Sequence, residues 1–148
     1  MRNDLEQYIQ EQKQCWEWYP EFKKKGIAVL THFVVYKSEC EDFQFLSVDW
    51  IARQLGISES YLSRCYKDFF KSSLYELIVQ RKMTVARKLL LQRPDLSMDE
   101  IAAKLDYCDG NYFIKVFKKE VNITPHQFRL KFSKRKKRTR KGRVNTKY

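Results

Sequence analysis

The feature that most constrains this chain is a sequence pattern that occurs twice. The first copy, at 47–67, is SVDWIARQLGISESYLSRCYK, and the second, at 97–118, is SMDEIAAKLDYCDGNYFIKVFK. Serine, aspartate, isoleucine, alanine and leucine recur in the first half of both copies at an offset of 50 residues. After one added residue, tyrosine, aromatic and basic residues recur in the second half. A pattern written twice predicts two copies of one structural unit.

Each copy has the composition of a short apolar helix, a tight turn and a second helix with an apolar and a polar, basic face. Ser47 is suited to cap the first helix of its copy, as Ser97 is in the second copy, and Gly56 can supply the positive φ of the turn. Ser58 and Asp109 are suited to cap the second helices. This order is that of the helix-turn-helix motif, whose second helix enters the major groove of DNA.

Composition favours an all-α, globular fold. Only four Gly and three Pro residues are present, and 43% of the residues are hydrophobic, enough to build a core. The net charge is +12, and residues 131–148 hold ten Lys and Arg residues without any Asp or Glu. This imbalance indicates a polyanionic partner, nucleic acid before an anionic membrane. We find no signal peptide and no apolar run of the ~18 residues that cross a bilayer, so a cytoplasmic protein is expected.

Further helices are expected around the duplicated units. The periodicity predicts helices at 4–18 and about 25–37, a polar connector at 38–45, and a last helix from the Thr124-Pro125 pair to about 132. Ser73 and Glu76 form a capping box that opens a long helix to about Gln92, and Pro94 follows it. The predicted organisation is an N-terminal helical extension (1–45), a DNA-binding domain (46–132) and a disordered basic tail (133–148). Within the domain we expect helix-turn-helix units at about 47–70 and 97–120, joined by a connecting helix at about 73–92.

The second helix of each unit offers candidate DNA contacts. In the first unit, Leu62, Cys65, Tyr66 and Phe69 are expected to face inward. In the second, Phe113, Val116 and Phe117 are expected to do so. The outward residues are then candidate base contacts: Ser60, Ser63 and Arg64 in the first unit, and Gly110, Asn111, Ile114 and Lys115 in the second. Candidate phosphate contacts are Ser58, Lys67, Lys118 and Thr124.

The residue types suit these roles. Arg64 can pair bidentately with guanine, Asn111 with adenine, and an apolar Ile114 can meet a thymine methyl group. The alternative is that both faces are ordinary solvated helix surfaces. A helix over 73–92 is about 30 Å long at 1.5 Å per residue, close to the ~34 Å turn of B-DNA. Two recognition helices separated in this way could enter successive major-groove segments.

No catalytic, cofactor or metal site is expected. The four cysteines lack metal-ligand spacing, His32 and His126 are isolated, and we find neither a phosphate loop nor a catalytic triad. Enzyme activity is therefore not predicted. The basic tail is interpreted as a non-specific DNA contact, with a merely solvated charge run as the alternative.

Residues 47–131 resemble the DNA-binding domain of the AraC/XylS family of bacterial transcription regulators. The resemblance lies in the two helix-turn-helix patterns, the stretch IVQRKMTVARKLLL and the signature DYCDGNYFIKVFKKEVNITPHQFR. It implies a seven-helix fold, binding to double-stranded promoter DNA, contact with RNA polymerase, activation rather than repression, and action at the bacterial nucleoid. The base contacts listed above also occupy the positions that contact bases in this family. Lys71, Asp106 and Asn122 stand where the family commonly has glycine.

The segment before the first repeat leaves alternatives open. About 45 residues are too few for the effector-binding barrel that many members of the resembled family carry, so no such domain is expected. The helix with Tyr8, Trp16, Trp18 and Tyr19 could form a homodimer seam, bind another protein, or pack on the flank of its own domain. For the whole chain, the alternative to a sequence-specific regulator is an architectural DNA-binding or protein-interaction module without sequence specificity.

Overall fold

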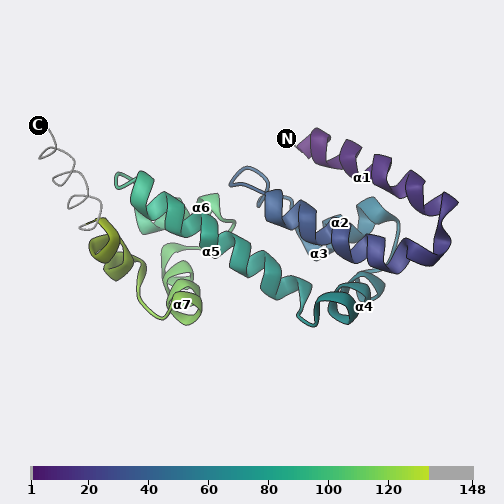
Figure 1. Cartoon of the computed structure of the whole chain (residues 1–148). Coiled ribbons are helices and arrows are strands. Elements are labelled where there is room, and N and C mark those ends of the chain that lie inside the picture. Colours follow the sequence, from purple (N-terminus) through teal and green to yellow (C-terminus); the bar gives the residue numbers. More distant parts are fainter. Residues whose placement is uncertain (1, 134–148) are drawn as a thin grey trace, which may run out of the picture. The chain divides into compact units, whose positions relative to one another are not determined.

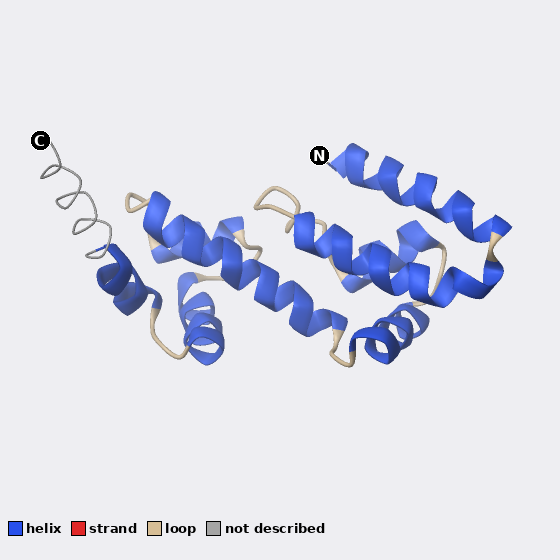
Figure 2. Cartoon of the chain, in the orientation of Figure 1, coloured by secondary structure: helices blue, strands red, loops and turns tan. Residues whose placement is uncertain are grey.

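A computed structural model describes residues 2–133, and within this range the chain is helical and contains no strand (Figures 1 and 2). The elements in chain order are α1 (Arg2–Trp18), the 3-10 helix η1 (Pro20–Phe22), α2 (Lys23–Lys37), α3 (Val48–Leu55), α4 (Glu59–Phe70), α5 (Leu74–Gln92), α6 (Met98–Lys104) and α7 (Gly110–Val121). Residues 125–133 form a further helix. The predicted all-α fold is confirmed. The predicted disorder of the tail lies outside the described residues from 134 on, and Ser133 is still helical.

The helix boundaries follow local capping chemistry. Six predicted caps are confirmed by a side-chain oxygen that accepts a hydrogen bond from the backbone amide three residues on: Ser47, Ser58, Ser73, Ser97, Asp109 and Thr124. At Thr124 the capping box is reciprocal, because the Thr124 amide also donates a hydrogen bond to Oε1 of Gln127 over 3.0 Å.

No helix within residues 2–133 combines the length and the apolar content that a bilayer-spanning segment requires.

The chain divides into two compact units, Met1–Lys82 and Met83–Tyr148, with α5 contributing to both. In the first unit, α2 packs against α4, and α1 packs against α2 and α3. The most deeply buried side chains of this unit include Ile9, Ile27, Ile51, Leu62 and Tyr66. Helix α2 is thus part of the core of the first unit. The domain boundary that we expected at residue 45 stays a prediction.

Helix α1 lies on the flank of its own unit. Ile9 is buried, and the rings of Tyr8 and Phe33 pack with their centroids 5.4 Å apart. Trp16 covers Gly26 so closely that a Cβ at Gly26 would lie 2.2 Å from Nε1 of the indole. Of the three roles left open for this helix, the structure therefore shows packing on its own domain.

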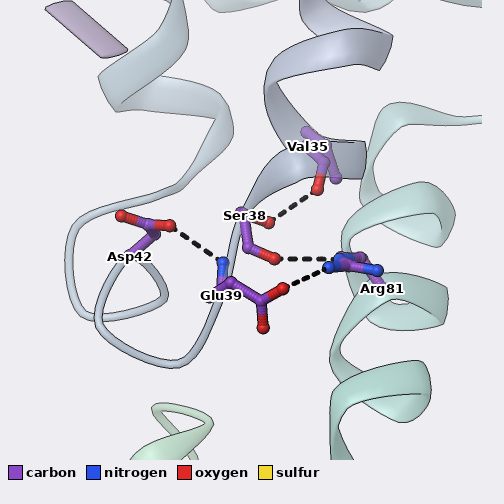
Figure 3. Close-up of polar contacts among 5 residues, drawn as sticks. All are labelled: Val35, Ser38, Glu39, Asp42 and Arg81. Atoms are coloured by element: carbon purple, nitrogen blue, oxygen red, sulfur yellow. Dashed lines mark hydrogen bonds and ion pairs between the residues drawn. The ribbon is translucent and has the colours of Figure 1, made fainter. Parts of the chain in front are cut away.

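The connector after α2 is polar, as expected, and it is fixed to the first half of α5 (Figure 3). Arg81 Nε donates to the carbonyl oxygen of Ser38 over 2.9 Å, and its Nη2 pairs with Oε1 of Glu39 at 3.1 Å. The Glu39 amide donates to Oδ2 of Asp42 over 2.8 Å. Ser38 and Asp42 are buried together with Phe43. These contacts hold the end of α2 and the start of α5 together within the first unit.

The second unit has an aromatic core. The rings of Phe113 and Phe117 in α7 pack 5.8 Å apart, and Phe117 packs edge-on against Phe128 at 5.7 Å. Arg129 bonds two backbone carbonyls, with Nε donating to Leu90 over 3.1 Å and Nη2 to Leu96 over 3.2 Å. The helix at 125–133 is therefore joined to the end of α5 and the start of α6 by both apolar and polar contacts.

Candidate nucleic-acid interface

The first recognition helix is α4, which follows α3 and the turn at Gly56. Gly56 has φ 67°, the left-handed conformation expected for this turn. Leu62, Cys65 and Tyr66 are buried as predicted. The prediction that Phe69 faces inward is wrong, because its side chain is 45% exposed.

Its neighbour Phe70 turns inward instead. The ring of Phe70 stacks on His32 of α2 at 4.5 Å and on Tyr66 at 4.8 Å. His32 Nδ1 and the Tyr66 hydroxyl are hydrogen-bonded at 2.9 Å, and burial raises the pKa of Tyr66 above its usual value. The last turn of α4 is therefore held to α2 by an aromatic cluster that includes a polar contact.

The outward face of α4 carries the predicted contact residues. Ser60, Ser63, Arg64 and Lys67 are all exposed. Tyr61 lies beside them and is half-buried; desolvation raises its pKa, and a hydrogen bond with Cys65 raises it further.

The second recognition helix is α7, and its face differs from the prediction at Gly110 and, in part, at Ile114. Asn111, Lys115 and Lys118 are exposed, and Ile114 is half-buried. Gly110, which we expected to be exposed, is buried against the first turn of α6. Its amide donates to Oδ1 of Asp99 over 2.8 Å, and an added Cβ would lie 2.7 Å from that oxygen. Gly110 is therefore packed against α6 in place of the exposed position that the prediction gave it.

The predicted phosphate contacts lie at helix starts and on exposed faces. Ser58 and Thr124 accept cap hydrogen bonds through their hydroxyl oxygens. Their hydroxyl protons are not used in these bonds and can be donated to a phosphate at the same helix N-terminus. Lys67 and Lys118 are exposed near the ends of α4 and α7. The base and phosphate assignments stay predictions.

All three residues that replace the expected glycines have left-handed backbones. Lys71 has φ 61°, Asp106 60° and Asn122 69°. Asn and Asp tolerate this region better than lysine does. Of the three residues, Lys71 at the end of α4 is therefore the type least suited to the left-handed backbone conformation.

Sequence patterns missed two groups at this interface. The repeat pattern assigns no contact to Asp99, but its carboxylate accepts the hydrogen bond that fixes the start of α7. The helix-turn-helix pattern does not include Lys24 and Lys25 of α2, yet both lie beside α4 and line a cavity with Cys65, Asp68 and Phe69. The sequence signal for these two lysines is a run of three lysines at the predicted start of a helix.

Among residues 2–133, we find no group of three or more His, Cys, Asp or Glu side chains placed to hold a metal.

Comparisons with known proteins agree with this architecture. A family model described as a helix-turn-helix domain matches residues 51–131. An uncharacterized HTH-type transcriptional regulator of Pseudoalteromonas carrageenovora is 34% identical over 91 residues, 62% of this chain and 53% of that protein. The probable transcription factor PqrA of Proteus vulgaris is 36% identical over 84 residues, 57% of this chain and 68% of that protein. The chain thus spans about half the length of the Pseudoalteromonas relative.

A solved structure shows the same fold. The C-terminal domain of AraT, a response regulator from Geobacillus stearothermophilus, superposes with a TM-score of 0.61 at 29% identity. The match covers 71% of this chain and 84% of that one. With two capped helix-turn-helix units, a family match over more than half of its length and regulators among its relatives, the chain belongs to the AraC-type helix-turn-helix family of DNA-binding transcription regulators.

Proposed function

We propose that this protein is a sequence-specific regulator that binds double-stranded promoter DNA through two adjacent major-groove segments. The observation that carries the proposal is the presence of one capped, outward-facing recognition helix in each unit, α4 and α7. The basic residues Arg64 and Lys115 occupy corresponding positions of the repeat, and both are exposed. Each can donate hydrogen bonds to guanine or to a phosphate.

The connecting helix supports a binding site of about two helical turns. Helix α5 is continuous over its 19 residues. At 1.5 Å per residue its length is about 28 Å, near the ~34 Å repeat of B-DNA. One chain would then supply both recognition helices, whereas many helix-turn-helix proteins need a dimer for two half-sites. We therefore expect one monomer to occupy one asymmetric site.

A charge-driven module without sequence preference is the alternative, and it is not favoured by the family of transcription regulators to which the chain belongs. Competition distinguishes the two. Duplexes selected from random DNA by the protein would be labelled and challenged with a large excess of random duplex. Specific binding survives the competitor, and charge-driven binding does not. Loss of all preference would reject the proposed function.

The regulatory direction is part of the proposal. The family resemblance favours activation through contact with RNA polymerase at a bacterial promoter, and hence action in the cytoplasm at the nucleoid. In vitro transcription from a promoter that contains the selected site measures this directly. Purified polymerase should produce more transcript when the protein is present, whereas a repressor would lower the yield.

A further inference from the structure

The first three residues of helix α2 are lysines. They lie at the N-terminal end, where a helix is least suited to positive charge. Lys23, Lys24 and Lys25 are exposed, and the first turn of α2 contains no acidic residue. The preceding residue, Phe22, provides no side-chain cap. Because the N-terminal end of a helix carries partial positive charge, cations there are unfavourable. The helix dipole therefore gives these three lysines no stabilising role at the start of α2.

Two of these lysines lie beside the recognition helix of the same unit. Lys24 lines a cavity of about 100 Å³ together with Tyr61, Arg64, Cys65 and Asp68. Lys24 and Lys25 line another, of about 200 Å³, with Cys65, Asp68 and Phe69. The lysines of α2 and Arg64 of α4 thus border the same side of the first unit, although they lie about forty residues apart in the sequence.

We propose that Lys24 and Lys25 bind phosphates of the DNA strand that borders the groove entered by α4. This inference rests on the proposed function and adds residues outside the family match at 51–131. When a recognition helix lies in the major groove, the elements on its flank face the sugar-phosphate backbone. A lysine has three donors on a flexible stem and suits a phosphate without fixed geometry.

The charges around the two cavities support a polyanion as the occupant. Asp68 borders both cavities and carries negative charge, but Lys24, Lys25 and Arg64 outweigh it. The exposed aromatic residues Trp18, Tyr19 and Phe22 precede the lysines, and aromatic rings next to lysines also suit an anionic lipid surface. The position of Lys24 beside Arg64 favours DNA, and lipid binding becomes an outcome of the test.

The test compares the double variant Lys24→Gln/Lys25→Gln with the wild-type chain on the selected duplex and on random duplex, at several salt concentrations. We expect binding to both duplexes to weaken roughly tenfold near physiological salt, with the slope of log K against log salt lowered by about 2. The preference between the duplexes should be unchanged. The variant Lys24→Arg/Lys25→Arg should retain the wild-type slope, and Lys37→Gln, at the other end of α2, is the matched control.

Thermal unfolding separates DNA contact from a structural role. Removing cations from the start of α2 should leave the unfolding temperature of the Gln variant unchanged or slightly raised. A lowered unfolding temperature together with weaker binding would overturn the inference, because the lysines would then act through the fold. An unchanged affinity and salt slope, in a wild-type chain that binds specifically, would overturn it while the proposed function stands.

Two further outcomes are distinguishable. If the wild-type chain shows no sequence preference, the proposed function fails, but the salt slope of the variants still decides whether the lysines contact phosphate. Co-sedimentation with vesicles of phosphatidylserine and phosphatidylcholine provides the lipid arm. Loss of vesicle binding by the Gln variant, with DNA binding unchanged, would overturn the inference in favour of a membrane surface.

Discussion

The backbone amide of Gly110 donates a hydrogen bond to Oδ1 of Asp99 over 2.8 Å, which joins the first residue of α7 to the first turn of α6. The corresponding aspartate of the first unit, Asp49, pairs instead with Arg53 on its own helix. The two copies therefore share their caps and their apolar pattern but differ in the joint between their two helices. In the second unit this joint is close-packed backbone, and only glycine fits there.

Gly110→Ala should destabilise the second unit. The new Cβ would lie 2.7 Å from Oδ1 and 3.0 Å from the backbone nitrogen of Asp99, so α6 and α7 must move apart. Such overpacking costs about 1–3 kcal/mol. Urea unfolding would measure the loss, with Lys119→Ala on an exposed position of the same helix as control. Equal effects of the two variants would contradict the close packing.

Lys71→Gly should stabilise the first unit. Lys71 has φ 61°, where a side chain is strained, and glycine removes that strain although it adds entropy to the unfolded chain. The expected net gain is about 0.5–1 kcal/mol, since relief of the roughly 1–2 kcal/mol left-handed strain exceeds the about 0.5–1 kcal/mol that glycine costs in chain entropy. Asn122→Gly is the matched comparison and should gain less, because asparagine tolerates the left-handed region. A larger gain at Asn122 than at Lys71 would show that the end of α4 is not the strained one.

The two recognition helices should contribute separable specificity. Arg64→Ala is expected to relax base preference in one half of the site, and Asn111→Ala or Lys115→Ala in the other half, each at a cost of about 1–3 kcal/mol. Binding to a set of duplexes with single base substitutions would map the loss. Lys104→Ala, an exposed change on α6, is the control. If either set of changes leaves the preference intact, the assignment of that helix is wrong.

Removal of Ser133 to Tyr148 should weaken binding to all duplexes by a similar factor. The segment is rich in Lys and Arg and contains no acidic residue, so it can neutralise phosphates and release counterions without distinguishing bases. Isotherms on specific and random duplexes should show a shallower salt dependence and a preserved specificity ratio. A collapsed ratio would indicate instead that this arm contacts bases in the minor groove.

The helices and their ends could be predicted from the sequence because they depend on neighbours in the chain. A cap such as Ser58 bonds an amide three residues away, and the glycine at 56 is needed by the turn that contains it. The duplication adds a second copy of the same local pattern. Local hydrogen bonding and side-chain periodicity therefore determined the all-α fold, both helix-turn-helix units and most of the two outward faces.

Tertiary structure decided the features that join distant segments. Phe69 and Phe70 are equally apolar, and Phe70 is the one that turns inward because its ring stacks on His32 of α2 and on Tyr66. Gly110 is buried because the backbone of α6 approaches it, and Lys24 lies beside Arg64 because α2 packs on α4. Helical periodicity specifies which residues share a face of one helix, but the rotation of each helix and the neighbour it meets depend on side-chain packing across the whole unit.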